Sequence, residues 1–313
     1  MLRRFPVIVG PTAGGKSALG VALARALTDR GQPAEIVTAD SMQVYRGMDI
    51  GTAKPTPEER GGIPHHLIDV VEPTASFSVD RWLTMAEGLI DALRGRGVVP
   101  IVVGGTHLYV KALLDGLFEG PPADASLRAS LSAMGAAALR KELERIDPDS
   151  AARIHPNDER RTVRAIEVFR LTGTPLSVHQ RQWDDRGRAD ALLVGLRWGA
   201  EALNRRINAR VKAMIEAGLV EEVRGLWSAG RLGEQARQAL GYKQLVDHFE
   251  GRCSADEALE KIKIETRRFA KNQRTWLRRL SLTPGSVWLD AGAGDGDGFA
   301  QVIAEKTLSD QAT

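Results

Sequence analysis

The sequence predicts an α/β protein, with a parallel sheet covered by helices on both faces and an inserted helical domain. The wholly apolar run at residues 5–9 is followed by a glycine-rich loop and then by a helical pattern at 17–27. Further apolar runs at 35–39 and 98–103 flank a helical segment, which is typical of parallel strands joined by crossover helices. Beyond Pro121 the strand pattern stops until residue 191, which indicates an insertion of helices.

The elements of the first part follow in order from apolar spacing. Residues 5–9 form a buried strand, and Leu19, Leu23 and Leu27 repeat at helical spacing after the loop. The strand at 35–39 ends at Asp40, and residues 40–64 form a long ordered loop rich in glycine and proline. Residues 82–93 are helical by pattern, and the strand at 98–103 ends in two glycines.

The chain divides into a catalytic core, an insertion and a tail. Residues 1–120 and 190–290 form the core, because a strand at 191–198 resumes the sheet, helices follow to residue 279, and residues 287–289 form a last short strand. Residues 121–189 form a helical insertion domain rich in alanine and arginine. Residues 291–313 begin with alternating glycines, which favours a flexible C-terminal tail.

Composition sets limits on compartment and partners. The net charge of +3 permits a nucleic-acid partner without demanding one. The single cysteine, Cys253, excludes a disulfide within the chain and a cysteine-based zinc site, and fits a reducing cytoplasm. No apolar run approaches the roughly 18 residues of a membrane-spanning helix. We therefore expect a cytoplasmic protein, acting as a monomer, that does not span a membrane.

A phosphate-binding loop opens the chain. The motif G-x-x-x-x-G-K-[ST] places backbone amides and a helix N-terminus around a phosphate, with Lys16 neutralising charge and Ser17 able to hold Mg²⁺. An apolar strand precedes the motif and a helix follows it, so the fold is predicted to be P-loop NTPase-like. The motif residues are Gly10, Pro11, Thr12, Ala13, Gly14, Gly15, Lys16 and Ser17.

The ends of the next two strands supply further candidates. ATPases and GTPases usually place an acid after a long apolar strand, whereas the strand at 98–103 ends in Gly104, Gly105 and Thr106, which weakens the motor and GTPase hypotheses. Because carboxyl ends of parallel strands share one crevice, Asp40 is well placed as a general base, or else only caps a turn with Ser41. Thr106 either donates to a phosphate oxygen or caps the helix that follows.

Arginine clusters indicate a polyanionic partner. Arg160 and Arg164 lie four residues apart on a predicted helix beside Arg161, where a solvated face is the default interpretation. Arg206 and Arg210 either point into the crevice or flank a core face. A second group of six cations lies on a short helical stretch that also contains Trp276, and no acidic residue occurs from 266 to 289. Such a group suits binding to a phosphate backbone. Its members are Arg267, Arg268, Lys271, Arg274, Arg278 and Arg279. The pair His65 and His66 lacks metal-ligand spacing.

Five ordered segments resemble those of tRNA dimethylallyltransferases of the bacterial type, the enzymes that prenylate an adenine next to the anticodon. The segments are Gly10 to Ser17, the 17 residues ADSMQVYRGMDIGTAKP at 39–55, VGGT at 103–106, IHPND at 154–158 and LGYKQ at 240–244. The second segment is far more specific than the phosphate loop. The resemblance extends over roughly residues 7–290.

The resemblance implies transfer of a dimethylallyl group from dimethylallyl diphosphate to the exocyclic amine of the adenine 3′-adjacent to the anticodon in tRNA. It implies that Asp40 takes the amine proton, and that the phosphate loop, Mg²⁺ on Ser17, Thr106 and Arg210 stabilise the departing diphosphate. The adenine would be flipped into the crevice. Contacts to the tRNA anticodon stem-loop are implied for Asp40, Ser41, Met42, Gln43, Thr106, Arg128, Arg160, Arg161, Thr162, Val163, Arg164, Gln238, Gly241, Tyr242 and Lys243.

Two alternatives remain open from sequence. A small-molecule or nucleoside kinase explains the loop and Asp40, but not the arginine-rich insertion or the cationic run near the C-terminus. The second alternative is a nucleic-acid-binding protein whose phosphate-binding loop is vestigial. Some relatives carry a basic residue in place of Gln238, and eukaryotic members add a zinc finger that one cysteine cannot build.

Overall fold

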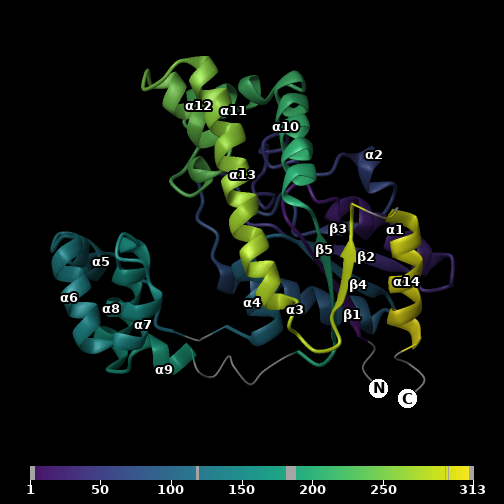
Figure 1. Ribbon diagram of the computed structural model, residues 1–313, viewed down its shortest axis with the longest axis horizontal. Coiled ribbons are helices and arrows are strands. Elements are labelled where there is room, and N and C mark those ends of the chain that lie inside the picture. The colour runs from purple at the N-terminus through teal and green to yellow at the C-terminus, as the bar shows by residue number, and fades with distance from the viewer. Residues whose placement is uncertain (1–3, 118–119, 181–187, 293, 295, 310–313) are drawn as a thin grey trace. The chain divides into compact units, whose positions relative to one another are not determined.

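The computed structural model describes residues 4–117, 120–180, 188–292, 294 and 296–309 (Figure 1). The chain forms two compact units. The first, which we call the sheet unit, comprises Met1–Leu113 and Ala189–Thr313. The second, the helical unit, is Leu114–Arg188. None of the helices in the described ranges is both long and apolar enough to cross a membrane.

The sheet unit is built on a six-stranded, wholly parallel sheet in the order β3-β2-β4-β1-β5-β6. Four strands form where apolar runs were predicted, within one residue at each end, and the predicted last strand at 287–289 also forms; the two-residue β3 was not predicted. The α/β, P-loop NTPase-like fold class is thus confirmed. The strands are β1 (Phe5–Val9), β2 (Ala34–Ala39), β3 (His65–His66), β4 (Val99–Gly104), β5 (Ala191–Arg197) and β6 (Val287–Asp290).

The register brings the carboxyl ends of the central strands together. Val9 of β1 and Ala39 of β2 both pair with Gly104 of β4. The segments that follow these strands are the phosphate loop, the Asp40 segment and the Gly105–Thr106 pair. They therefore start side by side, as expected for a ligand crevice in an open parallel sheet.

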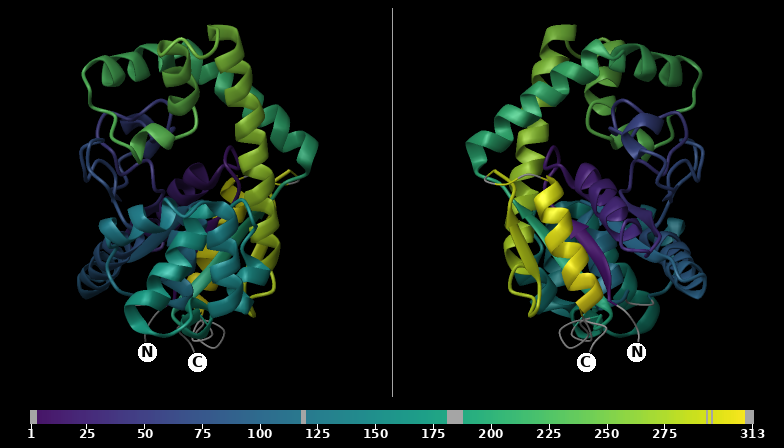
Figure 2. Two further views of the ribbon diagram at one scale, coloured as in Figure 1. Left: turned by 90° about the vertical axis from the view of Figure 1, so that its left-hand side faces the viewer. Right: turned by 90° about the vertical axis from the view of Figure 1, so that its right-hand side faces the viewer.

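Both faces of the sheet are covered, as Figures 1 and 2 show. Ile8, Ile36 and Ile101 face the helix that follows the phosphate loop. The alternate residues Val7 and Val102 are equally buried, which requires a second layer. The helix at 79–95 supplies this second layer, with Trp82 and its neighbours packed against the sheet. The helices of this unit are α1 (Lys16–Thr28), α2 (Pro57–Arg60), α3 (Val79–Gly95), α4 (His107–Asp115, whose last two residues belong to the helical unit), α10 (Ala200–Glu216), α11 (Leu219–Ser228), the 3₁₀ turn η2 (Ala236–Gln238), α12 (Tyr242–Phe249), α13 (Ala255–Leu280) and α14 (Gly296–Ser309).

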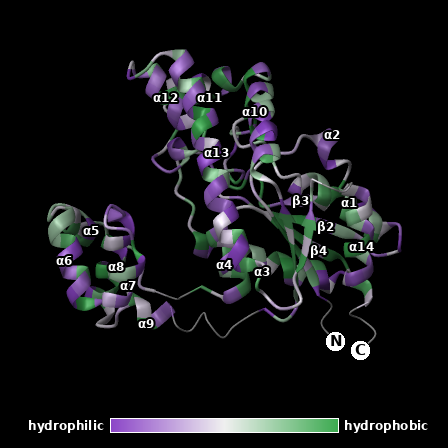
Figure 3. Ribbon diagram, in the orientation of Figure 1, coloured by the Kyte–Doolittle hydropathy of each residue, from purple (hydrophilic) through white to green (hydrophobic). Residues whose placement is uncertain are grey.

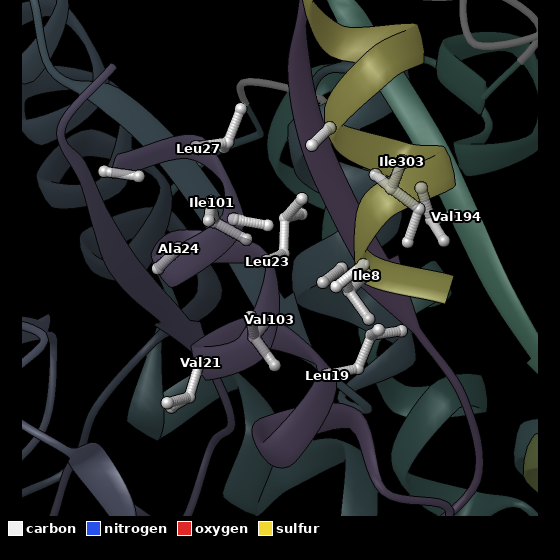
Figure 4. Packing of buried hydrophobic residues seen from close by; sticks show 14 of the residues in the cluster. Ile8, Leu19, Val21, Leu23, Ala24, Leu27, Ile101, Val103, Val194 and Ile303 are labelled. Carbon is white, nitrogen blue, oxygen red and sulfur yellow. The ribbon is translucent and has the colours of Figure 1, made fainter. Parts of the chain in front are cut away.

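The C-terminal segment corrects a prediction. Residues 291–313 were expected to be a flexible tail, but 296–309 form α14, which packs beside α1 (Figures 1 and 2). Ala300, Ile303 and Ala304 are buried in the core with Leu19 and Leu23 (Figure 4). The alternating glycines at the start of the segment obscured a stripe of small and apolar residues at helical spacing. Figure 3 shows the hydrophobic strands beneath this layer.

The helical unit has a core of its own. Leu131, Leu139, Leu143 and Ile166 are fully buried in one cluster. Strands are absent from its described residues, as the loss of the strand pattern predicted. Its helices are α5 (Ala125–Ser132), α6 (Ala136–Ile146), α7 (Pro148–Arg153), α8 (Glu159–Thr172) and α9 (Leu176–Gln180).

Candidate active site

The phosphate loop is held from outside by side chains distant in sequence. Trp198 Nε1 donates to the Gly14 carbonyl at 3.0 Å, and Arg206 Nε donates to the Ala13 carbonyl at 2.8 Å. The Arg206 guanidinium also lies over the Trp198 ring, 4.7 Å from its centroid. These donors hold two carbonyl oxygens away from an anion in the loop. Gly15 adopts a φ of 84°, a left-handed conformation that suits glycine and lets α1 begin at the next residue.

Lys16 carries a positive charge at the phosphate loop and lines the cavity described below. Its Nζ donates to the Pro11 carbonyl at 2.9 Å, which folds the side chain over the loop. Burial and the positive charge of Arg210 lower the pKa of Lys16 to about 8, against the opposing effect of Asp40. Burial likewise lowers the pKa of Arg210, while the charges of Asp40 and Glu59 oppose that shift. The two cations and the carboxylate are therefore electrostatic neighbours.

A cavity of about 430 Å³ opens between the loop, the carboxyl ends of the strands, and helices α10 and α13. All of its lining residues belong to the sheet unit. It brings together candidates far apart in sequence: Thr12, Ala13, Lys16, Ser17, Asp40, Ser41, Met42, Gln43, Thr106, Arg210, Gln238 and Gly241.

The two carboxylate oxygens of Asp40 have different surroundings. Oδ1 accepts from the backbone N–H of Met42 at 2.8 Å and of Gln43 at 3.3 Å, so the residue does cap a turn. Oδ2 accepts no hydrogen bond from the residues that the structure describes, and Asp40 lines the cavity. One oxygen therefore fixes the carboxylate, and the other is free to take a proton.

Thr106 does not cap α4 through its side chain. Its Oγ1 accepts from the backbone N–H of Ser41 at 3.0 Å and donates to Ser41 Oγ at 3.3 Å. Thr106 thus joins the end of β4 to the segment that follows β2. Gly104 is required at this junction, because a Cβ there would lie 2.1 Å from the Ala39 carbonyl oxygen.

Gln273 of α13 connects the phosphate loop to β4. Its Oε1 accepts from the Thr12 N–H at 2.8 Å, and its Nε2 donates to the Gly105 carbonyl at 3.0 Å. The side chain is buried, which fixes both hydrogen bonds in place. Neither Gln273 nor Trp198 was predicted as a site residue, because a single residue within a helix or after a strand carries no signal of its partners.

A carboxylate network builds the wall opposite the loop. Glu222 of α11 accepts from the N–H groups of Asp49, Ile50 and Gly51 at 2.7–3.1 Å, and from the hydroxyl of Tyr242. Burial and the charge of Glu222 raise the pKa of the Tyr242 phenol. The predicted tRNA contact of Tyr242 stays a prediction, and the side chain of this residue is fully buried. Gly241 is also buried, whereas Lys243 and Gln238 are exposed.

The remainder of the cavity is apolar. Ile207, Val211 and Met214 of α10 line it together with Leu219 and Ile262. Phe269 of α13 also lines the cavity, although its side chain is 44% exposed to solvent. A cavity with one cationic end, one carboxylate and an apolar wall suits an anion attached to a hydrocarbon chain.

The predicted residues of the insertion lie outside the cavity, in the helical unit. Arg128 and Arg164 both bond to Glu167, which is fully buried, at 2.7–2.9 Å. Thr162 and Val163 are buried, and the Thr162 hydroxyl donates to the Asp158 carbonyl. The predicted RNA contacts of these two residues stay predictions, and both side chains face the interior of the unit. Arg160 and Arg161 are exposed.

A metal site built from protein side chains alone is not found. Within the described ranges, no group of three or more His, Cys, Asp or Glu could hold an ion. His65 and His66 are engaged at the sheet edge, with Ile63 and Glu35 respectively. Ser17 is exposed in the first turn of α1, and its hydroxyl makes no hydrogen bond to any described residue. A hydroxyl oxygen of this kind fits Mg²⁺, which prefers oxygen ligands and retains phosphate and water oxygens.

The sheet topology, the loop and the cavity together define an α/β protein of the P-loop type that binds a phosphate compound at the carboxyl edge of its sheet. A family model described as IPP transferase matches residues 43–280. The chain belongs to this family, and the resemblance found from sequence is confirmed.

Similar proteins and solved structures support the membership of this family. The tRNA dimethylallyltransferase of Geobacillus kaustophilus (strain HTA426) is 50% identical over 297 residues, 93% of each chain. The structure of a full-length tRNA isopentenylpyrophosphate transferase from Bacillus halodurans is 39% identical, with a TM-score of 0.72, and covers 99% of this chain and 98% of its own. That of a eukaryotic dimethylallyltransferase acting on tRNA is 28% identical, with a TM-score of 0.79, over 99% and 77% of the two chains. These matches support the prenyltransferase hypothesis and not the kinase alternative.

Proposed function

We propose that this chain transfers a dimethylallyl group from dimethylallyl diphosphate to the exocyclic amine of the adenine 3′-adjacent to the anticodon in tRNA. The observation that carries the proposal is the placement of the Asp40 carboxylate, with one oxygen free, in the same cavity as the phosphate loop. The names of the matching relatives support the same substrates.

The reaction is a substitution at the allylic carbon. The amine nitrogen of adenine forms a bond to that carbon, the carbon–oxygen bond breaks, and its electron pair leaves on the diphosphate. The amine then carries an excess proton, which Oδ2 of Asp40 accepts, while Oδ1 keeps its hydrogen bond to the Met42 N–H. A positioned base of this kind contributes about 10²–10⁴ in rate.

Charge develops on the leaving diphosphate, and cations surround that position. We infer that Lys16, Arg210 and the N–H groups at the start of α1 stabilise it, because they meet at one end of the cavity. Thr106 contributes a hydroxyl at the same edge. Ser17 Oγ would hold Mg²⁺, which supplies further neutralisation of the diphosphate when bound.

The adenine must leave its stack to reach the cavity, at a cost of a few kcal/mol. Asp40, Ser41, Met42 and Gln43 line the side where the base would enter. The exposed ring of Phe269 offers it a surface for stacking, and base–aromatic stacking is worth about 1–3 kcal/mol. The apolar residues of α10 would contain the dimethylallyl group.

Further tRNA contacts are inferred from exposure. We propose that Arg160 and Arg161 of the helical unit, and Gln238 and Lys243 of the sheet unit, contact the anticodon stem-loop, since these side chains are exposed. Arg128 and Arg164 are bonded to Glu167, but their side chains are partly exposed. We propose that the chain acts as a monomer in the cytoplasm, where tRNA is found.

The test is incubation of the protein with an unmodified anticodon stem-loop RNA, dimethylallyl diphosphate and Mg²⁺, followed by mass spectrometry of the nucleosides. We expect prenyl-adenosine in wild type and none with an RNA whose target adenine is replaced by guanine. Absence of product, together with ATP turnover on a small acceptor, would establish the kinase instead. A parallel reaction with isopentenyl diphosphate in place of dimethylallyl diphosphate determines which of the two donors the enzyme uses.

A further inference from the structure

Lys54 is a buried cation in the segment that follows β2 and Asp40. Its side chain is only 4% exposed, and a charge in such a position has to be paired within the protein. The ammonium donates to the carboxylates of Asp49 and Asp69, and to the Tyr45 carbonyl at 2.9 Å. Since these acceptors come from separate points along the segment, one side chain joins three parts of it.

All three hydrogens of the Lys54 ammonium are engaged inside the protein. A lysine side chain carries three N–H donors and no acceptor, and Lys54 uses one donor on each of its three partners. Lys54 also lines a second cavity, of about 820 Å³, which borders on the phosphate loop. Because its donors are taken up by its own segment, Lys54 is suited to hold that segment and not to bind a ligand in the second cavity.

A first path of hydrogen bonds leads from Lys54 to the carboxylate of Asp40. Tyr45, whose carbonyl accepts from Lys54, donates its own N–H to the Met42 carbonyl at 3.3 Å. The Met42 N–H in turn donates to Asp40 Oδ1 at 2.8 Å. The turn that orients the carboxylate is therefore held by the ammonium at its far end.

A second path runs through Gln43, whose side chain is also buried. Its Nε2 donates to the carbonyls of Thr52 and Ala53 at 3.2 and 3.1 Å, and its backbone N–H donates to Asp40 Oδ1 at 3.3 Å. Ala53 has a φ of 47°, a left-handed conformation that alanine rarely adopts and that persists only where neighbouring contacts enforce it. Lys54 anchors the chain directly after this strained residue.

The partner Asp69 holds the same turn from another side. It also has a left-handed backbone, with a φ of 56°, which aspartate tolerates better than most residues. Its N–H donates to the Gln43 carbonyl at 3.1 Å, and its Oδ1 accepts from Lys54 at 2.5 Å. Without the ammonium, the carboxylates of Asp49 and Asp69 that share it would repel each other. Loss of Lys54 should therefore loosen the whole arrangement around Gln43.

We propose that Lys54 is a positioning residue for the general base, which it holds with Asp40 Oδ2 directed into the cavity, and that it contacts neither substrate. The proposal rests on the proposed function, in which Asp40 accepts the amine proton. Both hydrogen-bond paths end at Asp40 and not at the phosphate loop. Lys54 therefore acts on the chemical step, while binding of the diphosphate depends on Lys16 and Arg210.

The experiment compares Lys54→Met with a matched control in the sheet unit. Methionine keeps the length of the side chain but loses the charge and all three donors. The control, Arg94→Met, removes a partly buried cation that pairs with Asp190 at 2.6 Å and lines neither cavity. Because misplacing a reacting group by about 1 Å can cost 10²-fold in rate, we expect kcat of Lys54→Met to fall about 10–100-fold at saturating substrates. KM for dimethylallyl diphosphate should change less than about threefold, and Arg94→Met should keep both constants.

A double variant distinguishes positioning from a general loosening of the fold. If Lys54 acts only through Asp40, Lys54→Met added to Asp40→Asn should lower the single-turnover rate less than about twofold further, because the base is already lost. Thermal melting by circular dichroism verifies that the variants fold. Should Lys54→Met not fold, Asp69→Asn replaces it, since asparagine tolerates the left-handed backbone and removes one charge from the cluster. We expect a smaller fall in kcat there, again at unchanged KM.

Several outcomes would overturn the proposal. An unchanged kcat in Lys54→Met, or an equal fall in Arg94→Met, would show that Asp40 is held in place without Lys54. A full further loss of rate in the Asp40→Asn background would show that Lys54 acts on the reaction by another route. A rise in KM for dimethylallyl diphosphate at unchanged kcat would make Lys54 a donor-binding residue instead.

Failure of the proposed function gives a different pattern. Wild type that forms no prenyl-adenosine would exclude the reaction itself, whereas wild type and Lys54→Met that prenylate RNA equally fast would retain the reaction and exclude the positioning role. Hydrogen exchange of peptides from residues 40–55 gives a readout that does not depend on activity. Faster exchange in Lys54→Met than in Arg94→Met supports the hold of Lys54 on this segment, and equal exchange excludes it.

Discussion

Gln273 accepts a hydrogen bond from the backbone N–H of Thr12 at 2.8 Å, although 261 residues separate the two. The same side chain donates to the Gly105 carbonyl, so one residue near the end of a long helix sets the position of the phosphate loop relative to β4. The loop follows a five-residue strand, and its conformation depends on this contact from the far end of the sequence.

Replacement Gln273→Leu should loosen the phosphate loop. Leucine keeps a similar volume but leaves the Thr12 N–H and the Gly105 carbonyl without partners, at a cost of about 1–3 kcal/mol in the free energy of unfolding. We expect KM for dimethylallyl diphosphate to rise about tenfold, an energy change of about 1.4 kcal/mol, with a smaller change in kcat. Steady-state kinetics and urea unfolding measure both. Asn272→Leu, at the exposed neighbouring position, is the control, and an equal effect there would exclude the specific role of Gln273.

Two substitutions of Asp40 should distinguish its two roles, which are to accept the amine proton and to accept the hydrogen bond of the Met42 N–H. Asp40→Asn keeps an oxygen that accepts from the Met42 N–H but cannot take the amine proton. Asp40→Ala loses both functions. We expect both variants to lose about 10²–10⁴ in kcat while tRNA binding is largely retained, and only Asp40→Ala to lose about 1 kcal/mol of stability. Full activity of Asp40→Asn would exclude Asp40 as the base.

Strand ends were predictable from sequence because apolar runs and the residues that follow them are local signals. The apolar run 5–9, the glycine motif and Asp40 are each contiguous, and parallel strands bring their carboxyl ends to one edge whatever the intervening sequence. The placement of Asp40 and Thr106 at one cavity follows from that rule, whereas Arg210 reaches the cavity from helix α10. Their chemical roles remain proposals.

The contacts that hold these residues were not predictable, because their partners lie far away in sequence. Gln273, Trp198 and Glu222 are single polar residues in helices or at strand ends, and a helical pattern is the same whether such a residue faces solvent or a loop carbonyl. The prediction that residues 291–313 form a flexible tail was wrong because a misleading local signal hid a helix. Glycines at 292–298 masked the short helical stripe of Ala300 and Ile303, whose burial depends on α1, about 280 residues earlier.

Glu222→Ala should disturb the wall of the cavity without touching the substrates. Three backbone N–H groups and the Tyr242 hydroxyl lose their acceptor, so we expect a loss of about 2–3 kcal/mol in the free energy of unfolding, because each unsatisfied group costs about 1–3 kcal/mol and part is recovered by water. KM should rise for both substrates, since Gly51 and its neighbours line the cavity.

The exposed neighbour provides the control for that wall. Glu221→Ala removes the same charge from α11 and should leave stability and KM near wild type. Tyr242→Phe removes only one hydroxyl, and we expect a loss of about 1 kcal/mol with little change in KM for tRNA. A large rise in KM for tRNA at unchanged stability would instead show that Tyr242 contacts RNA directly.

Glu167 should govern the acid stability of the helical unit. Burial alone would raise its pKa, but the guanidinium groups of Arg128 and Arg164 and the Asp124 N–H outweigh burial, so its pKa lies below the ordinary value of 4.5. A carboxyl whose pKa is lower in the folded state contributes stability that is fully present above the unfolded pKa, and that is lost as pH falls through the folded pKa. Replacing it breaks a buried charge cluster, which costs about 3–5 kcal/mol.

Hydrogen exchange of the full chain, followed by mass spectrometry of peptides from α5 and α8, tests this prediction about Glu167. At pH 7, Glu167→Ala should speed exchange across both helices, while Glu144→Gln, which removes an exposed ion pair with Arg140, should change it little. Between pH 5 and the acid limit, wild type should lose protection in this unit, whereas Glu167→Ala should lose less because its contribution is already absent. Equal pH dependence in the two proteins would show that the acid sensitivity comes from another carboxylate, of which the buried Asp147, with Ser150 and Ser177 as donors, is the next candidate.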